Sequence, residues 1–175
     1  SFLLLVATAL CGRAGNVYDV RNFGAVGNGV HLDHAAINAA IDTCAAQGGG
    51  QVLIPAGNYL CGSIRLKSNI DLHLCVGARI VGAPQSMKAY DEAEKFEGSQ
   101  YQDGGHTYFH NSLIWGEHLQ NVSITGLGVI DGGGLTKQDR ESGTSILNGS
   151  IGLGDKTVAL KLCRNVNIHD VTILH

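Results

Sequence analysis

The chain is poor in proline and has no low-complexity tract. Only 2 of its 175 residues are proline, whereas 25 are glycine, about twice the glycine share of an average protein. Disorder explains this composition poorly, because disordered chains are enriched in proline and in biased tracts. Many tight turns between short strands explain it better.

The chain also lacks an excess of positive charge. Its net charge is −3 at pH 7 and no basic stripe is present, so we expect no nucleic-acid partner. The apolar run at residues 2–10 is too short to cross a bilayer, and we expect no membrane span.

Residues 1–15 are predicted to be part of a secretory signal. Small-residue cleavage options follow the apolar run, as in the end of a signal peptide. The protein is then expected to be secreted, extracellular or periplasmic. Two alternatives stay open: residues 2–10 could be a buried first strand, and Cys11 could be a lipid-attachment site.

The remaining cysteines show no metal-binding pattern. They form no Cys-x-x-Cys pair and no zinc spacing, which favours buried thiols that act as small apolar residues. These cysteines are Cys44, Cys61, Cys75 and Cys163.

What the chain does have is a repeated tetrad of asparagine, aliphatic, any residue and aliphatic. It occurs at Asn69-Ile70-Asp71-Leu72, Asn121-Val122-Ser123-Ile124 and Asn165-Val166-Asn167-Ile168, with spacings of 52 and 44 residues. If each spacing holds two turns, the period is that of a stacked repeat fold. We expect the three asparagines to be structural and to hydrogen-bond turn backbone from rung to rung.

Alternation of apolar and polar residues predicts a series of short strands with one buried face. Residues 83–111 and 135–155 interrupt the pattern as long loops. The predicted strands are residues 17–20, 51–54, 59–61, 64–66, 70–75, 79–81, 112–115, 122–125, 129–130, 158–162 and 166–174.

One helix is predicted, at residues 35–47. Asp33 is expected to cap its N-terminus, and three glycines follow its end. Ile37, Ala40, Ile41 and Cys44 give it one apolar face. Such a helix would cover the open end of a coil of strands.

These segments resemble the opening of the polygalacturonase family, within the pectate-lyase-like β-helix superfamily. The resemblance runs in family order from Asp19 to His175, and the segment from Gly126 to Gly134 points to the hydrolases in particular. It implies an all-β fold: a right-handed, single-stranded parallel β-helix (solenoid) with one N-terminal capping α-helix. Residues 16–175 would be the N-terminal part of that domain, truncated at its C-terminal end.

The resemblance also implies inverting hydrolysis by an acid and a base. Inversion requires two carboxyl groups roughly 6.5 to 9.5 Å apart. The family carries its catalytic groups in Asn-Thr-Asp, Asp-Asp, Gly-His-Gly and Arg-x-Lys motifs. Only the last occurs here, as Arg65-Leu66-Lys67, too early in family order and best interpreted as surface charge.

No catalytic, cofactor-binding or metal-ligating residue is therefore assigned, and no cofactor is expected. His106 and His110 have zinc-ligand spacing but lie in a predicted loop. Residues 149–157 and 24–29 imitate phosphate-binding and dinucleotide-binding loops without the context that either needs. Asp131, Asp139 and Glu141 are the nearest approach to a carboxylate cluster, and we expect Asp131 to cap a turn among glycines.

The aromatic residues are concentrated between Tyr90 and Trp115, which hold six of the ten. Packing of the long loop onto the coil is the favoured role of these residues. The alternative is a border to a carbohydrate groove, since aromatic faces can stack on sugar rings.

The sequence therefore predicts the N-terminal fragment of a secreted glycoside hydrolase, polygalacturonase-like and inverting, with the fragment itself inactive. Pectic polysaccharide is the expected substrate of the full-length protein, which we expect to be a monomer. A β-eliminating pectate or pectin lyase and a non-catalytic, polysaccharide-binding or tailspike-like β-helix are the alternatives. A coil that ends after Ile173 and Leu174 is expected to expose an unpaired strand edge and to self-associate.

Overall fold

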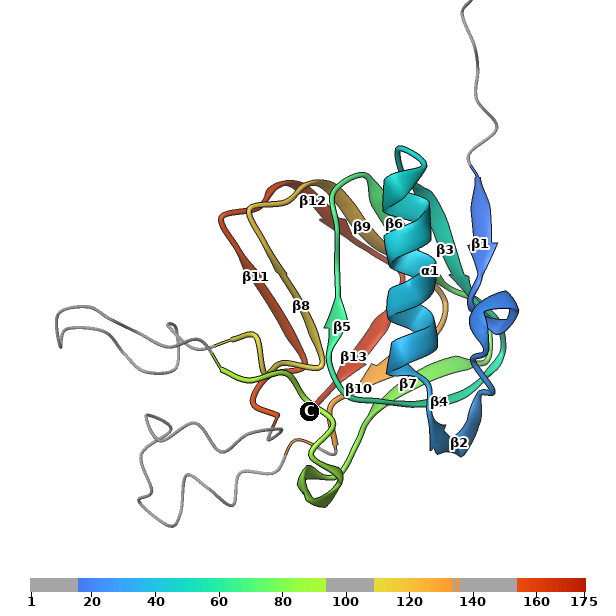
Figure 1. The fold of residues 1–175 in the computed structure, drawn as a ribbon, viewed down its shortest axis with the longest axis vertical. Helices are drawn as coiled ribbons and strands as arrows, with labels where there is room; N and C mark the ends of the chain where they lie inside the picture. The colour runs from blue at the N-terminus through green and yellow to red at the C-terminus, as the bar shows by residue number, and fades with distance from the viewer. Residues whose placement is uncertain (1–15, 94–108, 134, 136–153) are drawn as a thin grey trace, which may run out of the picture.

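The computed structural model describes residues 16–93, 109–133, 135 and 154–175. Within them, three parallel sheets surround an apolar interior and one α-helix packs at their beginning (Figure 1). Sheet 1 contains, in spatial order, β1 (Val17–Asp19), β3 (Gly50–Ile54), β6 (Ile70–Leu74), β9 (Gln120–Gly126) and β12 (Arg164–Ile168). Sheet 2 contains β2 (Asn28–Leu32), β4 (Gly57–Cys61), β7 (Ala78–Gly82), β10 (Val129–Asp131) and β13 (Thr172–Leu174). Sheet 3 contains β5 (Ile64–Arg65), β8 (Ile114–Glu117) and β11 (Val158–Lys161).

The chain passes through the three sheets in a fixed cyclic order. From β3 onward it visits sheet 1, then sheet 2, then sheet 3, and each new strand pairs parallel with the strand of the previous turn. In the first turn, helix α1 (His34–Ala46) follows β2 in the place where a strand of sheet 3 would stand. The described chain is therefore a coil with one strand per sheet in each turn, and α1 lies at its beginning.

The strand register corrects the predicted number of turns. Gln51 pairs with Asp71, Asp71 with Ser123, and Ser123 with Asn167. The spacings of 52 and 44 residues are thus one turn each, with additional residues inserted between β7 and β8 and between β10 and β11. Spacing alone could not show this, because closing a longer loop costs little additional entropy and leaves the strands paired.

The three asparagines of the repeated tetrad form a ladder across consecutive turns. Asn121 Nδ2 donates to Asn69 Oδ1, and Asn165 Nδ2 donates to Asn121 Oδ1, both at 2.8 Å. Their φ angles are 63°, 56° and 54°, a left-handed conformation that asparagine tolerates better than most residues. The predicted contact from rung to rung is confirmed, but it joins the asparagine side chains to one another instead of to the turn backbone.

In the turn that precedes Asn69, Gly49 occupies the position that corresponds to the ladder asparagines, since Gly50 pairs with Ile70. Gly49 has φ +102°, and a Cβ atom there would lie 2.3 Å from the backbone oxygen of Asn69. A side chain would therefore be strained by the backbone conformation and would also collide with the next turn.

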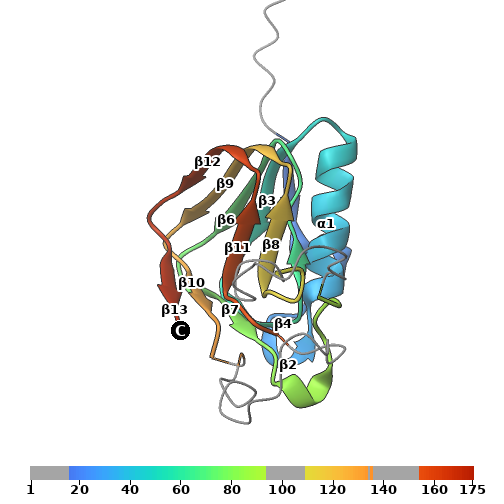
Figure 2. The ribbon, with the colours of Figure 1, turned by 90° about the vertical axis from the view of Figure 1, so that its left-hand side faces the viewer.

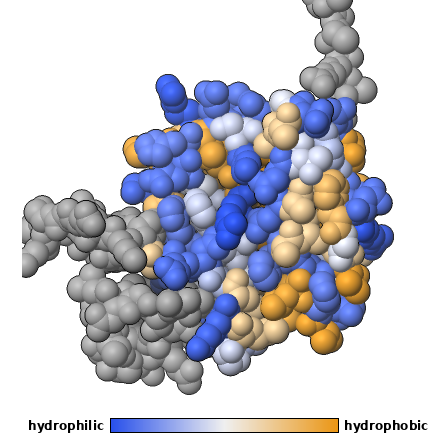
Figure 3. All heavy atoms as spheres, viewed as in Figure 1, coloured by the Kyte–Doolittle hydropathy of each residue, from blue (hydrophilic) through white to orange (hydrophobic). Residues whose placement is uncertain are grey.

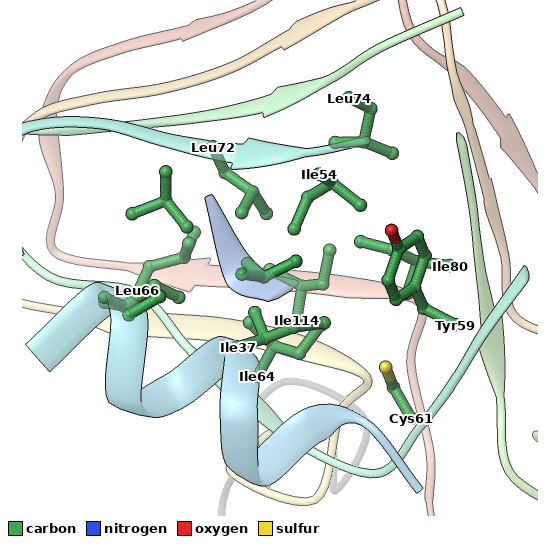
Figure 4. Close-up of a cluster of buried hydrophobic side chains, with 14 of the residues drawn as sticks. Ile37, Ile54, Tyr59, Cys61, Ile64, Leu66, Leu72, Leu74, Ile80 and Ile114 are labelled. Atoms are coloured by element: carbon green, nitrogen blue, oxygen red, sulfur yellow. The ribbon is translucent and has the colours of Figure 1, made fainter. Parts of the chain in front are cut away.

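The interior is formed by the inward-facing residues of every strand together with one face of α1. Figure 4 shows aliphatic side chains from α1 and from the strands meeting in this space. Each of the following is fully buried: Ile37, Ala40, Ile41, Cys44, Val52, Ile54, Tyr59, Ile64, Leu72, Leu74, Ile80, Ile114, Ile124 and Ile130. The predicted apolar face of the helix is therefore confirmed.

Three details of the sequence prediction are wrong. Residues 28–32 form strand β2, which is missing from the predicted strands, because its exposed edge position hides the alternation that marks a strand. Residues 166–174 form two strands, because Asp170 has φ 65° between them and turns the chain from sheet 1 to sheet 2. Asp33 precedes α1 but makes no side-chain capping bond; its carboxylate accepts from the amides of Val26 and Gly27 instead.

The prediction that the cysteines are buried thiols is confirmed in part. All four that the structure describes are free thiols. Cys44 and Cys61 are buried, and burial raises the pKa of the Cys61 thiol well above its usual value. Cys75 and Cys163 are only half-buried.

The last turn exposes apolar side chains that the turn before it buries. Val166 and Ile168 on β12 are 40% and 39% exposed, whereas their partners Val122 and Ile124 on β9 are 1% and 0% exposed. Ile173 and Leu174 are also exposed, as predicted; self-association through this edge stays a prediction.

The face of the molecule in Figure 3 is mainly hydrophilic, with hydrophobic residues over α1 and near β2. No helix among the described residues is long and apolar enough to cross a membrane.

The asparagine ladder can be tested at its central member. Asn121→Ala removes both amide bonds and places alanine in a left-handed conformation, so the free energy of unfolding should fall by about 1–3 kcal/mol. Asn121→Gly removes the same bonds without the conformational strain and should lose less. Urea unfolding of the three proteins measures the difference; equal stability of all three would contradict a stabilising ladder.

Candidate functional site

The outer face of sheet 3 carries the largest group of interacting charged and aromatic side chains in the described chain. Ile64 and Ile114 point into the interior and are fully buried, so the alternate residues Arg65 and Trp115 point outward. Arg65 pairs in register with Trp115, and Glu117 pairs with Lys161 on the next turn. Figure 2 shows β8 and β11 side by side on this face.

Asp91 joins this face from the segment that follows β7. Arg65 donates to its carboxylate through Nε at 2.8 Å and Nη2 at 2.5 Å, and Trp115 Nε1 donates to Oδ2 at 2.9 Å. The Asp91 amide donates to Ser63 Oγ at 3.0 Å, which holds the backbone against β5. Burial alone would raise the pKa of Asp91, but the bonds from Arg65 and Trp115 lower it below its ordinary value.

The pKa of His34, at the start of α1, depends in part on the charge of Asp91. Burial lowers the pKa of its imidazole, and Asp91 opposes that effect. The Arg65–Asp91 pair therefore stays charged beside a histidine that favours its neutral form.

Glu117 is the centre of a second group of charges on this face. Its carboxylate lies 3.3 Å from His110 Nε2, 3.3 Å from Lys161 Nζ and 3.8 Å from His118 Nε2. Burial opposes ionisation, but hydrogen bonds and charge from Lys161, then from His110, bring the pKa of Glu117 below its ordinary value. The carboxylate therefore stays ionised at neutral pH.

The aromatic rings connect the two groups of charges. The His110 ring stacks on Trp115 with centroids 3.9 Å apart and an interplanar angle of 28°. Phe109 meets the same indole edge-to-face at 6.2 Å, and Lys161 Nζ lies 5.2 Å from the centre of the Phe109 ring. We call Arg65, Asp91, His110, Trp115, Glu117 and Lys161 the sheet 3 cluster.

This chemistry suits binding better than acid catalysis. A general acid in a glycoside hydrolase needs a carboxyl group whose pKa is raised so that it keeps its proton. Asp91 and Glu117 are instead tied into ion pairs and their pKa values are lowered. The cluster offers an aromatic surface, hydrogen-bond donors and exchangeable ion pairs, which are features of a polar ligand site.

Asp131 behaves as the sequence predicted, as a turn-capping residue on β10. Its Oδ1 accepts from the Gly133 amide at 2.9 Å and from His175 Nδ1 at 2.8 Å, and Arg79 donates to Oδ2. The bond from His175 is the main reason that the pKa of Asp131 falls to about 2. Asp139 and Glu141 lie outside the described residues, so the carboxylate cluster is not tested.

The remaining candidate residues have structural or untested roles. His106 lies outside the described residues, and His110 belongs to the sheet 3 cluster. No group of three or more possible metal ligands occurs in the described part of the chain. In the loop of residues 24–29, Asp33 accepts from two amides, which are the donors that a phosphate would require. Of residues 149–157, whose sequence imitates a phosphate-binding loop, only residues 154–157 are described.

The predictions for the surface charges and for the aromatic residues are confirmed in part. Arg65 and Lys67 are surface charges, and Lys67 pairs with Asp42 on α1 at 2.6 Å. Tyr90 and Phe109 are buried, which supports the packing role of the long loop, whereas Trp115 is half-buried on the outer face. Phe96, Tyr101 and Tyr108 lie outside the described residues.

Sequence reasoning did not identify Asp91, Glu117 or Lys161 as members of a site. The alternation of β8 and β11 could have shown that Glu117 and Lys161 point outward. It could not show that they are neighbours, because that depends on the register between turns. Asp91 reaches the cluster only through the course of a long loop.

Comparisons with known proteins place these features in a family. A family model described as rhamnogalacturonase A/epimerase, pectate lyase-like, matches residues 17–170. The chain is 32% identical to the exo-poly-alpha-D-galacturonosidase of Dickeya chrysanthemi over 124 residues, which are 67% of this chain and 20% of that protein.

Two further relatives extend the comparison. Plasmin and fibronectin-binding protein A of Streptococcus pneumoniae is 34% identical over 155 residues, 87% of this chain and 20% of that protein. The crystal structure of a hyperthermoactive exopolygalacturonase from Thermotoga maritima matches with a TM-score of 0.67 and 27% identity, covering 90% of this chain and 41% of that one. The chain thus spans about a fifth of the length of the curated relatives.

The bonds of Asp131 predict a specific loss of stability in acid. Because its pKa falls from 3.8 to about 2 on folding, the stabilisation is present above pH 3.8 and is lost as the pH falls through about 2. Asp131→Asn should be less stable than the wild type at pH 6, and the difference should shrink between pH 4 and pH 2. Asp42→Asn, which disturbs only an exposed pair, should keep the wild-type acid dependence. Unfolding by urea at each pH tests this; a constant difference would contradict the assignment.

Proposed function

Because the chain belongs to the rhamnogalacturonase A/epimerase, pectate lyase-like family, we propose that it is part of an enzyme that hydrolyses pectic polysaccharide. The observation that carries the proposal is its similarity to an exo-poly-alpha-D-galacturonosidase over 67% of its length. The parallel coil of three sheets supports the polygalacturonase-type fold, for which we propose a right-handed, single-stranded parallel β-helix. We also propose that the protein is secreted, with a signal in residues 1–15.

The proposed reaction is an inverting hydrolysis. One carboxyl group protonates the leaving oxygen while another activates a water molecule on the opposite face of the sugar, and the gap between them admits that water. Asp91 and Glu117 do not fit the acid role, because their ion pairs lower their pKa values. The proposal therefore assigns the acid and the base to residues outside this 175-residue sequence, which lacks the family's Asn-Thr-Asp and Asp-Asp motifs.

Residues 16–175 would then supply the scaffold and a ligand-contacting surface. Parallel pairing fixes the outer face of sheet 3 at one strand per turn, and a rigid strand surface holds side chains more accurately than a loop does. The sheet 3 cluster is the described surface whose aromatic rings and donors best suit a polysaccharide.

A second candidate function is binding without chemistry. It is favoured by the 34% identity to plasmin and fibronectin-binding protein A over 87% of this chain, and by the ionised state of both carboxylates in the sheet 3 cluster. In this case the same outer face would contact a partner, and no product would form.

The two candidates differ in a hydrolysis assay on polygalacturonate. We expect the product of the complete open reading frame to release reducing ends, and the 175-residue chain alone to release none, because it lacks the proposed acid and base. Nuclear magnetic resonance of the first products should show inversion at the anomeric carbon.

The other outcomes decide against the proposal in different ways. Release of reducing ends by the 175-residue chain would show that its own residues supply the chemistry. Ultraviolet-absorbing unsaturated ends would indicate β-elimination, and retention of the anomeric configuration would exclude inversion. No product from the complete protein would favour the binding function.

A further inference from the structure

Strand β5 is the edge strand of sheet 3 in the described chain, and helix α1 packs against it (Figure 1). The side chain of Asn38, on α1, makes two hydrogen bonds to the backbone at this edge. We propose that the Asn38 amide takes the place of one residue of a first strand of sheet 3 and thereby fixes the position of Asp91 on the outer face. The inference goes beyond the proposed function, because it holds whether the protein hydrolyses a polysaccharide or only binds one.

The two hydrogen bonds of Asn38 reproduce the pattern of a parallel strand. Asn38 Nδ2 donates to the Ser63 carbonyl at 2.9 Å, and Asn38 Oδ1 accepts from the Arg65 amide at 2.8 Å. A residue in a parallel strand likewise donates to the carbonyl before its register partner and accepts from the amide after that partner. The register partner of the Asn38 amide is therefore Ile64.

The next turn shows the same pattern between two backbones. Ile64 pairs with Ile114, and the Ile64 amide donates to the carbonyl of Leu113, the residue before Ile114. Successive residues of a parallel strand direct their backbone groups to opposite sides, so the free groups of Ser63 and Arg65 point toward α1. The amide on the helix thus continues the row of Ile64 and Ile114 one turn earlier.

The position of Asn38 in the sequence is unfavourable unless these bonds form. Asparagine is a weaker helix former than alanine, yet Asn38 lies in the interior of α1 between Ile37 and Ala39. Ser63 is 1% exposed, and a buried carbonyl without a hydrogen-bond partner lowers the free energy of unfolding. Asn38 removes that cost at the turn where α1 stands in place of a strand.

The two residues that Asn38 holds both hold Asp91. Ser63 Oγ accepts from the Asp91 amide at 3.0 Å, and Arg65 donates two hydrogen bonds to the Asp91 carboxylate. The same carboxylate accepts from Trp115 Nε1 at 2.9 Å. One amide on α1 therefore fixes the backbone of two anchors of Asp91, and through Asp91 it orients the indole.

A second residue of α1 faces the same pair of charges. His34 is four residues before Asn38, so the two side chains lie on one face of the helix. The charges of Asp91 and Arg65 both affect the pKa of His34, which burial lowers. Two successive turns of α1 therefore face the Arg65–Asp91 pair, and the geometry of the pair depends on how the helix docks.

The single tryptophan gives a direct readout of this coupling. Trp115 is the only tryptophan of the 175-residue chain, and its indole N–H donates to Asp91. Asn38→Leu keeps a side chain of similar volume but has no amide. We expect hydrogen exchange of the indole N–H and of the Arg65 amide to accelerate by about tenfold or more, because the first loses its fixed acceptor and the second its partner. The Leu66 amide, which donates to the Trp115 carbonyl on the next turn, should keep the wild-type rate. Nuclear magnetic resonance measures all three rates.

Matched variants separate positioning from a general loss of stability. Asn38→Asp keeps an acceptor for the Arg65 amide but loses the donor to Ser63. The Arg65 amide should then stay protected, and exchange of the indole N–H should accelerate less than in Asn38→Leu. Thr43→Val removes a hydroxyl that donates to the Ala39 carbonyl of the same helix, and it should leave all three rates unchanged. Circular dichroism checks that each variant is folded.

The possible results decide the proposal in either direction. An unchanged indole rate in Asn38→Leu would show that Asn38 does not position Asp91. Equal acceleration of the Leu66 and Arg65 amides would show a general loss of stability and would also overturn the proposal. If Asn38→Leu does not fold, Asn38→Asp decides alone. Acceleration confined to the indole N–H then supports the proposal, whereas acceleration of the Leu66 amide as well, or no acceleration at all, contradicts it.

Discussion

The parallel pairing of consecutive turns is the constraint on which the rest of this structure depends. Each strand takes its register from the strand one turn earlier, so residues of like character stack in rows across the sheets. Inside, Val52, Leu72 and Ile124 form such a row and are fully buried. The same register brings Asn69, Asn121 and Asn165 into hydrogen-bonding contact at the corner of the coil.

Additional residues are inserted between the paired strands at two places in the coil. Both long departures from the coil leave after a strand of sheet 2 and return at a strand of sheet 3, between β7 and β8 and between β10 and β11. Asp91 and His110 come from the first of these segments and meet Trp115 on the outer face of sheet 3. Loops tolerate added residues and commonly carry function on a rigid scaffold. The specialised surface therefore forms where inserted residues return to a fixed strand.

The electrostatics of that surface favour recognition over proton transfer. Both carboxylates in the cluster have lowered pKa values because cations and hydrogen-bond donors stabilise their ionised forms. A charged pair with one exposed member can exchange its partner for a ligand, whereas a carboxyl group that must donate a proton needs the opposite environment. This difference supports the proposal that these residues contact a polysaccharide while the chemistry takes place elsewhere in the protein.

By itself the sequence determined the local features: the alternating strands, the amphipathic helix predicted at residues 35–47 and found at residues 34–46, the turn asparagines and the family resemblance. These follow from side-chain periodicity and backbone preference, which act over a few residues. Only the tertiary structure decided that 52 and 44 residues are single turns, that Asp33 bonds to a loop, and that Glu117 meets Lys161. Those contacts depend on register and on where long loops return, and both are set by packing between residues far apart in the chain.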